Sequence, residues 1–302
     1  MGEYKICPYE TVSSWIQIEE GNTMKIAYGT YAMPTLPLER ALQMIADIGY
    51  DGVEICISPK HNSMPDDLDS ATRQKLREKL SELNLGVPAL FMLGSVLTED
   101  KEAHKKRLEL TKQVMQIARD LNMGESPVIS TGIGGRTAMW ETHSDLLLQQ
   151  IGDYAKLASG EGFVLAVEAH CNAMIDRTER AIWLMEAVNN PLIRLHFDIV
   201  HFYLAKEPIT ETVKKLLPYT AHTHVTDAEI LEDGFKLLPL GRGELDCVEY
   251  VKAMHEAGWD DFITVEVSTM VWSQEGYSPY AVAALSYSTL NSAFKSAGVP
   301  RT

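Results

Sequence analysis

The sequence is poor in several features that mark particular classes of protein. Cysteine occurs four times in 302 residues, at Cys7, Cys56, Cys171 and Cys247, and no C-x-x-C pair is present. Thiols so widely spaced do not make a disulfide framework, so we expect a reducing, cytoplasmic location. No run of about 18 apolar residues is available to span a membrane. The first residues also lack the basic and apolar segments of a secretory signal.

Basic residues and glycine-rich turns are also scarce. Lysine and arginine total 27 against 42 acidic residues, which gives a net charge of −15. Such a chain repels a phosphate backbone, so nucleic-acid binding is excluded as its main function. The one glycine cluster, GIGGR at 132–136, lacks the G-x-G-x-x-G pattern and a following helix start. It favours a tight loop over a phosphate-binding turn.

Short apolar runs alternate with amphipathic segments from Met24 onward. Residues 1–23 show no steady period, so we expect an N-terminal extension there and one catalytic domain over 24–302. The runs are nearly continuous in apolar residues, as strands buried on both faces require. The expected strands are Lys25–Tyr31, Gly52–Ile57, Val87–Leu93, Val128–Gly132, Val164–His170, Ile193–Val200, Ala221–Thr226 and Phe262–Ser268.

A helical pattern follows each of these strands. Apolar residues recur there at i, i+3 and i+4, and several segments end on glycine. The expected helices are Leu38–Gly49, Leu68–Leu85, His104–Leu121, His143–Ser159, Glu179–Val188, Thr210–Leu217, Val248–Gly258 and Tyr280–Gly298. Eight strand–helix units predict an α/β fold, a single closed (β/α)8 TIM barrel. An open doubly wound sheet is the alternative, although it usually has fewer strands and a glycine-rich phosphate turn.

The last four expected strands each carry one acid or imidazole near the end, where barrel enzymes place their chemistry. These residues are Glu168, Asp198, His224 and Glu266. A buried carboxylate without a partner is costly, so three of them beside a histidine predict a shared cation. Three oxygen ligands and one imidazole suit Mn²⁺ best, with Mg²⁺ or Co²⁺ as alternatives.

This order of ligands resembles the xylose-isomerase-like TIM barrels of sugar isomerases and epimerases. The matching segments are GYDGVEI at 49–55, D-x-x-H from Asp198, H-x-H-x-x-D from His222, LGRGELD at 240–246 and VEVS at 265–268. The resemblance implies a keto-sugar or polyol substrate and a metal that polarises the carbonyl group. It also implies that Glu168 and Glu266 act as both ligand and acid/base, and that His201 hydrogen-bonds a substrate oxygen.

The chain departs from the free ketose epimerases of this family in two places. His170 lies two residues after Glu168, on the same face of the strand, where it either acts as a general base or only positions the substrate. The arginine that follows the seventh-strand histidine in those epimerases is missing. Arg242 is left either to face the substrate or to form a loop salt bridge. We assign Asp227 to orient His222 or His224.

The segment after Glu266 carries Met270, Trp272 and Tyr277. These residues either bind an apolar part of the ligand, such as an aglycone, with Trp272 in contact, or pack the eighth loop. The segment resembles the catalytic α subunits of C-glycoside deglycosidases, which work with a small β subunit. Cys171 is either a nucleophile or a buried spectator thiol.

Three classes of function remain after these steps. The first is a metal-dependent isomerase or epimerase that abstracts a proton beside a carbonyl. The second is a lyase, either a C-glycoside deglycosidase that releases an aromatic aglycone from a 3-oxo-glycoside or a sugar dehydratase. The third, a non-catalytic sugar-binding barrel, is disfavoured by the full set of ligand types. An endonuclease on abasic DNA shares the fold but needs a basic groove. We expect either a homo-oligomer or a complex with the small subunit.

Overall fold

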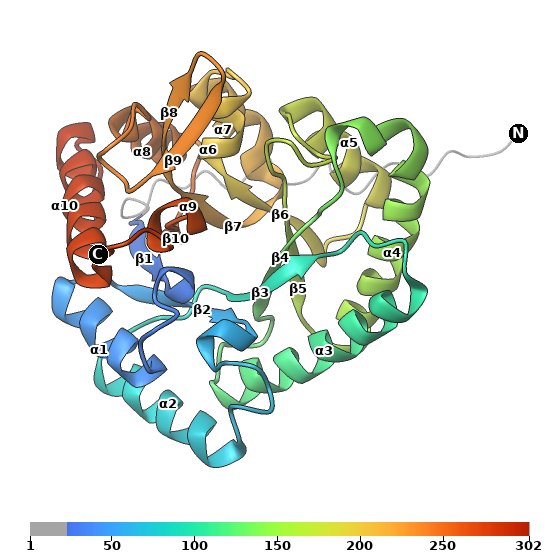
Figure 1. Ribbon diagram of the computed structural model, residues 1–302, viewed down its shortest axis with the longest axis horizontal. Coiled ribbons are helices and arrows are strands. Elements are labelled where there is room, and N and C mark those ends of the chain that lie inside the picture. The colour runs from blue at the N-terminus through green and yellow to red at the C-terminus, as the bar shows by residue number, and fades with distance from the viewer. Residues whose placement is uncertain (1–22, 302) are drawn as a thin grey trace, which may run out of the picture.

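Eight parallel strands close into a barrel in the computed structural model, which describes residues 23–301 (Figure 1). The strand order is β1-β10-β7-β6-β5-β4-β3-β2, and β1 pairs with both β2 and β10 to complete the ring. The strands are β1 Lys25–Gly29, β2 Gly52–Ile57, β3 Leu90–Ser95, β4 Val128–Gly132, β5 Val164–Glu168, β6 Ile193–Asp198, β7 Thr220–Val225 and β10 Phe262–Val265. The predicted (β/α)8 barrel is confirmed. The extension predicted over residues 1–23 lies, apart from Thr23, outside the described residues.

The helices surround this barrel, and several of them begin at an aspartate whose side chain caps the first backbone amides. They are α1 Leu38–Ile48, α2 Ser70–Glu82, α3 Lys101–Asp120, α4 Trp140–Glu161, α5 Thr178–Val188, α6 Ile199–Leu204, α7 Ile209–Leu216, α8 Cys247–Glu256, α9 Thr269–Trp272 and α10 Pro279–Ala297, with short 3-10 turns at Thr30–Ala32, Pro59–His61, Thr137–Met139 and Leu217–Tyr219. Helix α3 begins three residues before the predicted start because the Asp100 carboxylate accepts hydrogen bonds from the first backbone amides. Within residues 23–301, no helix combines the length and apolarity needed to cross a membrane.

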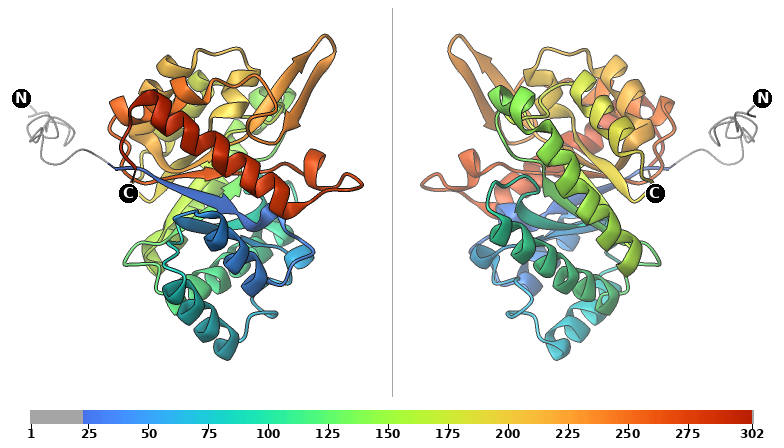
Figure 2. Two further views of the ribbon diagram at one scale, coloured as in Figure 1. Left: turned by 90° about the vertical axis from the view of Figure 1, so that its left-hand side faces the viewer. Right: turned by 90° about the vertical axis from the view of Figure 1, so that its right-hand side faces the viewer.

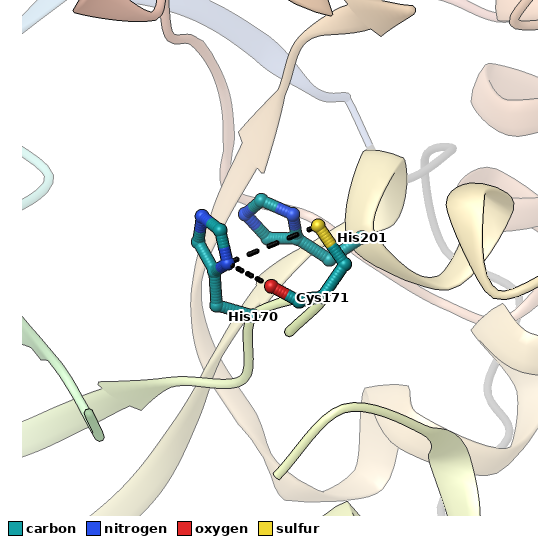
Figure 3. Close-up of side chains that lie close together, drawn as sticks. All are labelled: His170, Cys171 and His201. Atoms are coloured by element: carbon teal, nitrogen blue, oxygen red, sulfur yellow. Dashed lines mark hydrogen bonds between the residues drawn. The ribbon is translucent and has the colours of Figure 1, made fainter. Parts of the chain in front are cut away.

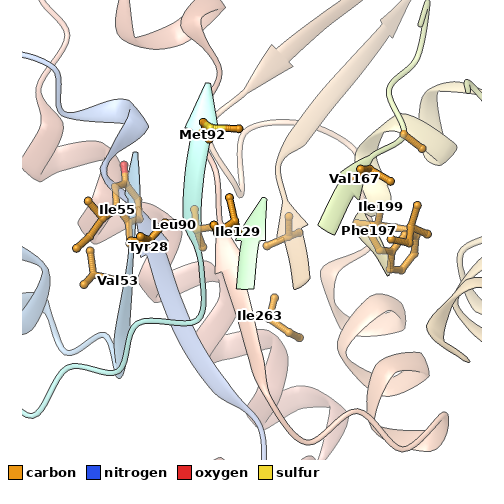
Figure 4. Close-up of a cluster of buried hydrophobic side chains, with 14 of the residues drawn as sticks. Tyr28, Val53, Ile55, Leu90, Met92, Ile129, Val167, Phe197, Ile199 and Ile263 are labelled. Carbon is orange, nitrogen blue, oxygen red and sulfur yellow. The ribbon is translucent and has the colours of Figure 1, made fainter. Parts of the chain in front are cut away.

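The core extends from the barrel interior to the layer between strands and helices (Figure 4). All six residues of β2 are buried, and so are all four of β10. Tyr28, Ile129 and Phe197 are fully buried members of the same hydrophobic cluster. Because both faces of each strand are covered, the apolar runs of the sequence are nearly continuous.

A β-hairpin interrupts the barrel between β7 and α8. Strands β8 (Asp227–Leu231) and β9 (Gly234–Leu238) pair antiparallel through the two-residue turn Glu232–Asp233. Figure 2 shows this hairpin and the loop bearing α9 projecting from the same side of the barrel, the side of the strands' carboxyl ends. The sequence does not make the hairpin obvious, although Asp-Gly is a recognised hairpin signal and Glu232, Asp233 and Gly234 lie between Leu231 and Phe235. Ala228 and Leu237 of the hairpin form a small cluster with Val200 of α6, separate from the main core.

Candidate metal centre and catalytic pocket

The barrel brings the four predicted ligands together at the carboxyl ends of neighbouring strands. Glu168 and Asp198 end β5 and β6, His224 lies near the end of β7, and Glu266 follows β10. Asp198 pairs in register with His224, which pairs on its other side with Thr264. One donor atom of each of the four residues lies within 4.8 Å of the corresponding atoms of the other three. The predicted convergence is therefore present, and the ligand roles themselves stay predictions.

The chemistry of this cluster fits a divalent cation. Nδ1 of His224 lies 3.6 Å from Oε2 of Glu266 and 4.0 Å from Oε1 of Glu168. Asp198 and His224 are fully buried, and neither Oδ2 of Asp198 nor Nδ1 of His224 has a hydrogen-bond partner within the described chain. Two orphaned atoms aimed at two further carboxylates form an oxygen-rich set with one imidazole, which suits Mn²⁺, Mg²⁺ or Co²⁺.

Burial also shifts the acidity of the two deepest carboxylates. Desolvation, followed by the nearby Glu266, raises the pKa of Glu168 to about 7. Desolvation raises the pKa of Asp198 to about 7, against a partial opposing effect of His201. Close carboxylates that share a dry site resist simultaneous ionisation, and a cation would relieve that repulsion.

Glu54, in the middle of β2, hydrogen-bonds His224, the histidine among the four predicted ligands. Its fully buried carboxylate accepts hydrogen bonds from Nε2 of His222 at 2.8 Å and from Nε2 of His224 at 2.9 Å. Ser130 Oγ donates a third, at 3.2 Å. Burial alone would raise the pKa of Glu54, but His224 and His222 outweigh it and lower the pKa to about 2. A proton held at Nε2 leaves Nδ1 of His224 free to face the carboxylate cluster.

The role predicted for Asp227 is wrong. Its carboxylate accepts from the backbone N–H groups of Ala228, Gly241, Gly243 and Leu245, at 2.9 to 3.0 Å, and so holds the loop that follows the hairpin. Backbone donors therefore occupy both carboxylate oxygens of Asp227, and the histidines are hydrogen-bonded by Glu54 instead. The signal for Glu54 was available in GVEICI, where a single acid stands in an otherwise apolar strand.

His170 and His201 form a second group beside the carboxylates (Figure 3). His201 lies one turn into α6, with Nε2 3.8 Å from both Glu168 Oε1 and Asp198 Oδ2. The rings of His170 and His201 lie with centroids 3.8 Å apart. Nδ1 of His170 lies within hydrogen-bond distance of the backbone oxygen of Cys171, so it carries the proton and leaves Nε2 as a potential base. Desolvation and then His201 lower the pKa of His170, which favours this neutral form.

A cavity of about 620 Å³ opens over this group. Its lining includes Glu168, His170, His201 and Glu266, together with a wall of apolar side chains. Cys171 also lines it, and burial raises the pKa of its thiol to about 12, which disfavours a nucleophilic thiolate.

Two predicted substrate contacts do not reach this cavity. Neither Arg242 nor Trp272 is among the described residues that line it. Arg242 is exposed on the loop that Asp227 holds. Trp272 instead packs edge-on against Tyr31, with ring centroids 5.4 Å apart. Tyr31 and Met270 do line the cavity, although no role for Tyr31 was predicted from the sequence.

A parallel eight-stranded barrel with carboxylates and histidines at the carboxyl ends of its strands defines the (β/α)8 class of proteins, whose active sites lie at that end of the barrel. Residues 42–286 match the family described as xylose isomerase-like TIM barrel, and the chain belongs to that family.

Several characterised proteins resemble the chain across most of its length. Fructoselysine 3-epimerase of Escherichia coli O157:H7 is 23% identical over 266 residues, covering 83% of this chain and 93% of the relative. Inosose isomerase of Bacillus velezensis is 23% identical over 241 residues, covering 76% and 83%. The solved structure of 3-keto-D-glucoside 4-epimerase YcjR from E. coli superposes with a TM-score of 0.70 at 14% identity, covering 89% of this chain and all of that one. The relatives include a sugar epimerase and an isomerase, which supports a sugar-modifying enzyme.

Proposed function

We propose that the protein is a divalent-metal-dependent isomerase or epimerase of a keto-sugar or related carbohydrate, which abstracts a proton from the carbon next to a carbonyl group. The observation that carries this proposal is the set of four donors from Glu168, Asp198, His224 and Glu266 within 4.8 Å of one another. The similarity to fructoselysine 3-epimerase and inosose isomerase supports the same class of reaction.

Glu168, Asp198, His224 and Glu266 would hold the cation, with Mn²⁺ as the first choice. A cation held there would act as a Lewis acid that polarises the carbonyl and acidifies the neighbouring C–H bond. Glu168 and Glu266 both line the cavity, so each can accept a proton from the substrate carbon or return one to it. His201, buried beside Glu168, is placed to hydrogen-bond a substrate oxygen.

Deuterium exchange tests this proposal directly. The Mn²⁺-loaded protein is incubated in deuterated water with a panel of free ketoses and 3-oxo-sugars, and deuterium on carbon is measured by mass spectrometry. We expect incorporation by the wild type and a loss of about 1,000-fold or more in Glu168→Gln and Glu266→Gln, because each removes a proton-transfer group. The exposed Glu275→Gln is the matched control. Wild-type exchange rates in both glutamate variants would contradict the mechanism.

A second function, a lyase on an oxo-sugar, is favoured by His170. Its imidazole lines the cavity beside Glu168, where a further base can start the elimination of a leaving group such as an aglycone or water. His170→Ala distinguishes the two. A fall in rate of about 100-fold or more, as expected when a general base is removed, supports the lyase. A small fall in rate supports the epimerase. Release of an aglycone from a 3-oxo-glycoside, followed by chromatography, is the second readout.

We also propose that the protein works in the cytoplasm as an oligomer, either of identical chains or with a small second subunit. The three cysteines within residues 23–301 are unpaired thiols, which supports a reducing compartment. Light scattering of the purified protein, alone and after co-expression with candidate small subunits, measures the assembly.

A further inference from the structure

The catalytic cavity is partly walled by exposed apolar side chains. Four large hydrophobic residues are exposed among residues 23–301, and two of them, Leu93 (37%) and Met270 (49%), line this cavity. Ile133, Phe235 and Leu237 line it as well. Exposed apolar side chains that gather in one cavity, rather than scattering over a surface, mark a surface that binds an apolar group.

Three of the side chains in this wall belong to elements outside the barrel, and the fourth belongs to barrel strand β3. Phe235 and Leu237 belong to β9 of the hairpin, Met270 belongs to α9, and these two elements are in contact. Both project on the side of the strands' carboxyl ends, so they extend the cavity outward from the carboxylates (Figure 2). Leu93 approaches from the end of β3. We refer to Leu93, Phe235, Leu237 and Met270 as the apolar wall.

The size of the cavity agrees with a ligand larger than a single sugar. Its volume of about 620 Å³ lies in the range of sites for drug-sized molecules, about 300–1,000 Å³. A free keto-sugar carries a hydroxyl or carbonyl on nearly every carbon and offers little surface that would gain from contact with the apolar wall. The carboxylates and histidines offer polar partners for the sugar, and an apolar substituent would gain more than a free sugar from contact with the apolar wall.

We propose that the substrate is a keto-sugar joined to an apolar substituent, such as an aryl group, which packs on the apolar wall while the sugar lies beside Glu168 and Glu266. This inference rests on the proposed function for the sugar half alone. The presence of an apolar substituent is inferred from the exposed apolar residues of the cavity. It applies equally to the epimerase and to the lyase.

A pair of matched ligands tests the proposal. Binding of methyl and phenyl 3-oxo-β-D-glucopyranoside to the Mn²⁺-loaded protein is measured by calorimetry. We expect the phenyl compound to bind about 10- to 100-fold more tightly, because the apolar wall buries its ring. In the double variant Leu93→Ser/Met270→Ser this preference should fall to about 3-fold or less, since both side chains would be polar and smaller.

The control is the double variant Val248→Ser/Tyr280→Ser, which removes the other two exposed hydrophobic residues and should keep the wild-type preference. Equal affinity of the two glycosides for the wild type, or a preference unchanged in Leu93→Ser/Met270→Ser, overturns the proposal. Self-association of the wild type that Met270→Ser abolishes, measured by light scattering, would also overturn it by assigning the wall to a second copy. Deuterium exchange separates the two claims: a phenyl preference without exchange contradicts the proposed function and leaves the apolar wall intact.

Discussion

Glu54 and His224 are joined by a 2.9 Å hydrogen bond across the barrel interior, between strands β2 and β7, which are not neighbours in the sheet. The bond occupies Nε2 of the imidazole and leaves Nδ1, the atom without a partner, on the side of Glu168 and Glu266. The position of Nδ1, the nitrogen that faces the other predicted ligands, therefore depends on a residue that does not itself belong to their cluster.

Replacing Glu54 should weaken metal binding. In Glu54→Gln, one carboxylate oxygen becomes an amide NH2, which donates and cannot accept. The side chain can then no longer accept a hydrogen bond from both His222 and His224 through separate oxygens. We expect Mn²⁺ affinity to fall by about 10- to 100-fold, measured by calorimetry. Ser130→Ala, which removes only the third hydrogen bond to Glu54, should change the affinity much less. Wild-type affinity in a folded Glu54→Gln protein would show that the histidine needs no such support.

Loading the protein with Mn²⁺ should raise its melting temperature, because an ion that binds only the folded chain stabilises it by mass action. Asp198→Asn should abolish most of this rise, since Asp198 Oδ2 is one of the two orphaned buried atoms. Oδ1 of Asp198 caps α6 by accepting from the Val200 amide at 3.0 Å, and asparagine can also cap, so the variant should still fold. Scanning fluorimetry with Mn²⁺ and with a chelator measures both. An equal rise in wild type and variant would place the ion elsewhere.

The stability of the metal-free protein should depend on pH through Glu168. Because desolvation and Glu266 raise the pKa of Glu168 from 4.5 to about 7, the folded chain holds this proton to higher pH than the unfolded chain. Its contribution to the free energy of unfolding is therefore lost as pH rises between these two values. Glu168→Gln should gain stability relative to the wild type over that window, on the order of 3 kcal/mol. Urea unfolding of chelator-treated protein at several pH values measures the difference, in which the shared histidines cancel. A constant difference would contradict the raised pKa.

Asp227→Asn should destabilise the loop that follows the hairpin without changing metal affinity. The carboxylate accepts four backbone hydrogen bonds, and an amide side chain can accept through one atom only. We expect the free energy of unfolding to fall by about 2 kcal/mol, because some backbone N–H groups lose their charge-assisted hydrogen bond to Asp227 and become unsatisfied. Glu244→Gln on the same loop is exposed and serves as the control. A fall in Mn²⁺ affinity at unchanged stability would restore the role in histidine orientation that the sequence suggested.

The barrel could be predicted because each strand is buried on both faces and each helix has one apolar face, and both patterns are local in the sequence. The strand ends were predicted less well. The run Val164–His170 continues two residues past the end of β5, because the chain leaves the sheet directly after Glu168 to make the turn that carries His170. The β8–β9 hairpin was missed because its alternating pattern lies between the seventh predicted strand and the helix predicted to follow it. Eight strand–helix units were already complete without it.

Convergence of the four predicted ligands followed from the topology alone, since neighbouring parallel strands end at the same rim. The hydrogen-bond partners of these residues could not be predicted from the topology. Glu54 lies on β2 and His224 on β7, 170 residues apart in the chain, and only barrel closure brings them into contact. Asp227 follows His224 closely in sequence and was assigned to it for that reason, yet its carboxylate points to backbone amides of a later loop.

The small cluster formed by Val200, Ala228 and Leu237 is separate from the main core of the described chain. Opening of the β8–β9 hairpin therefore breaks few contacts that the barrel needs, and its amide hydrogens should exchange with solvent far sooner than those of β5 or β6. Substitutions in this hairpin other than at Asp227 should therefore leave the barrel folded. Under the proposed role of the apolar wall, selectivity for the ligand and resistance to heat would be set largely by different parts of the chain, and either could be altered while the other is retained.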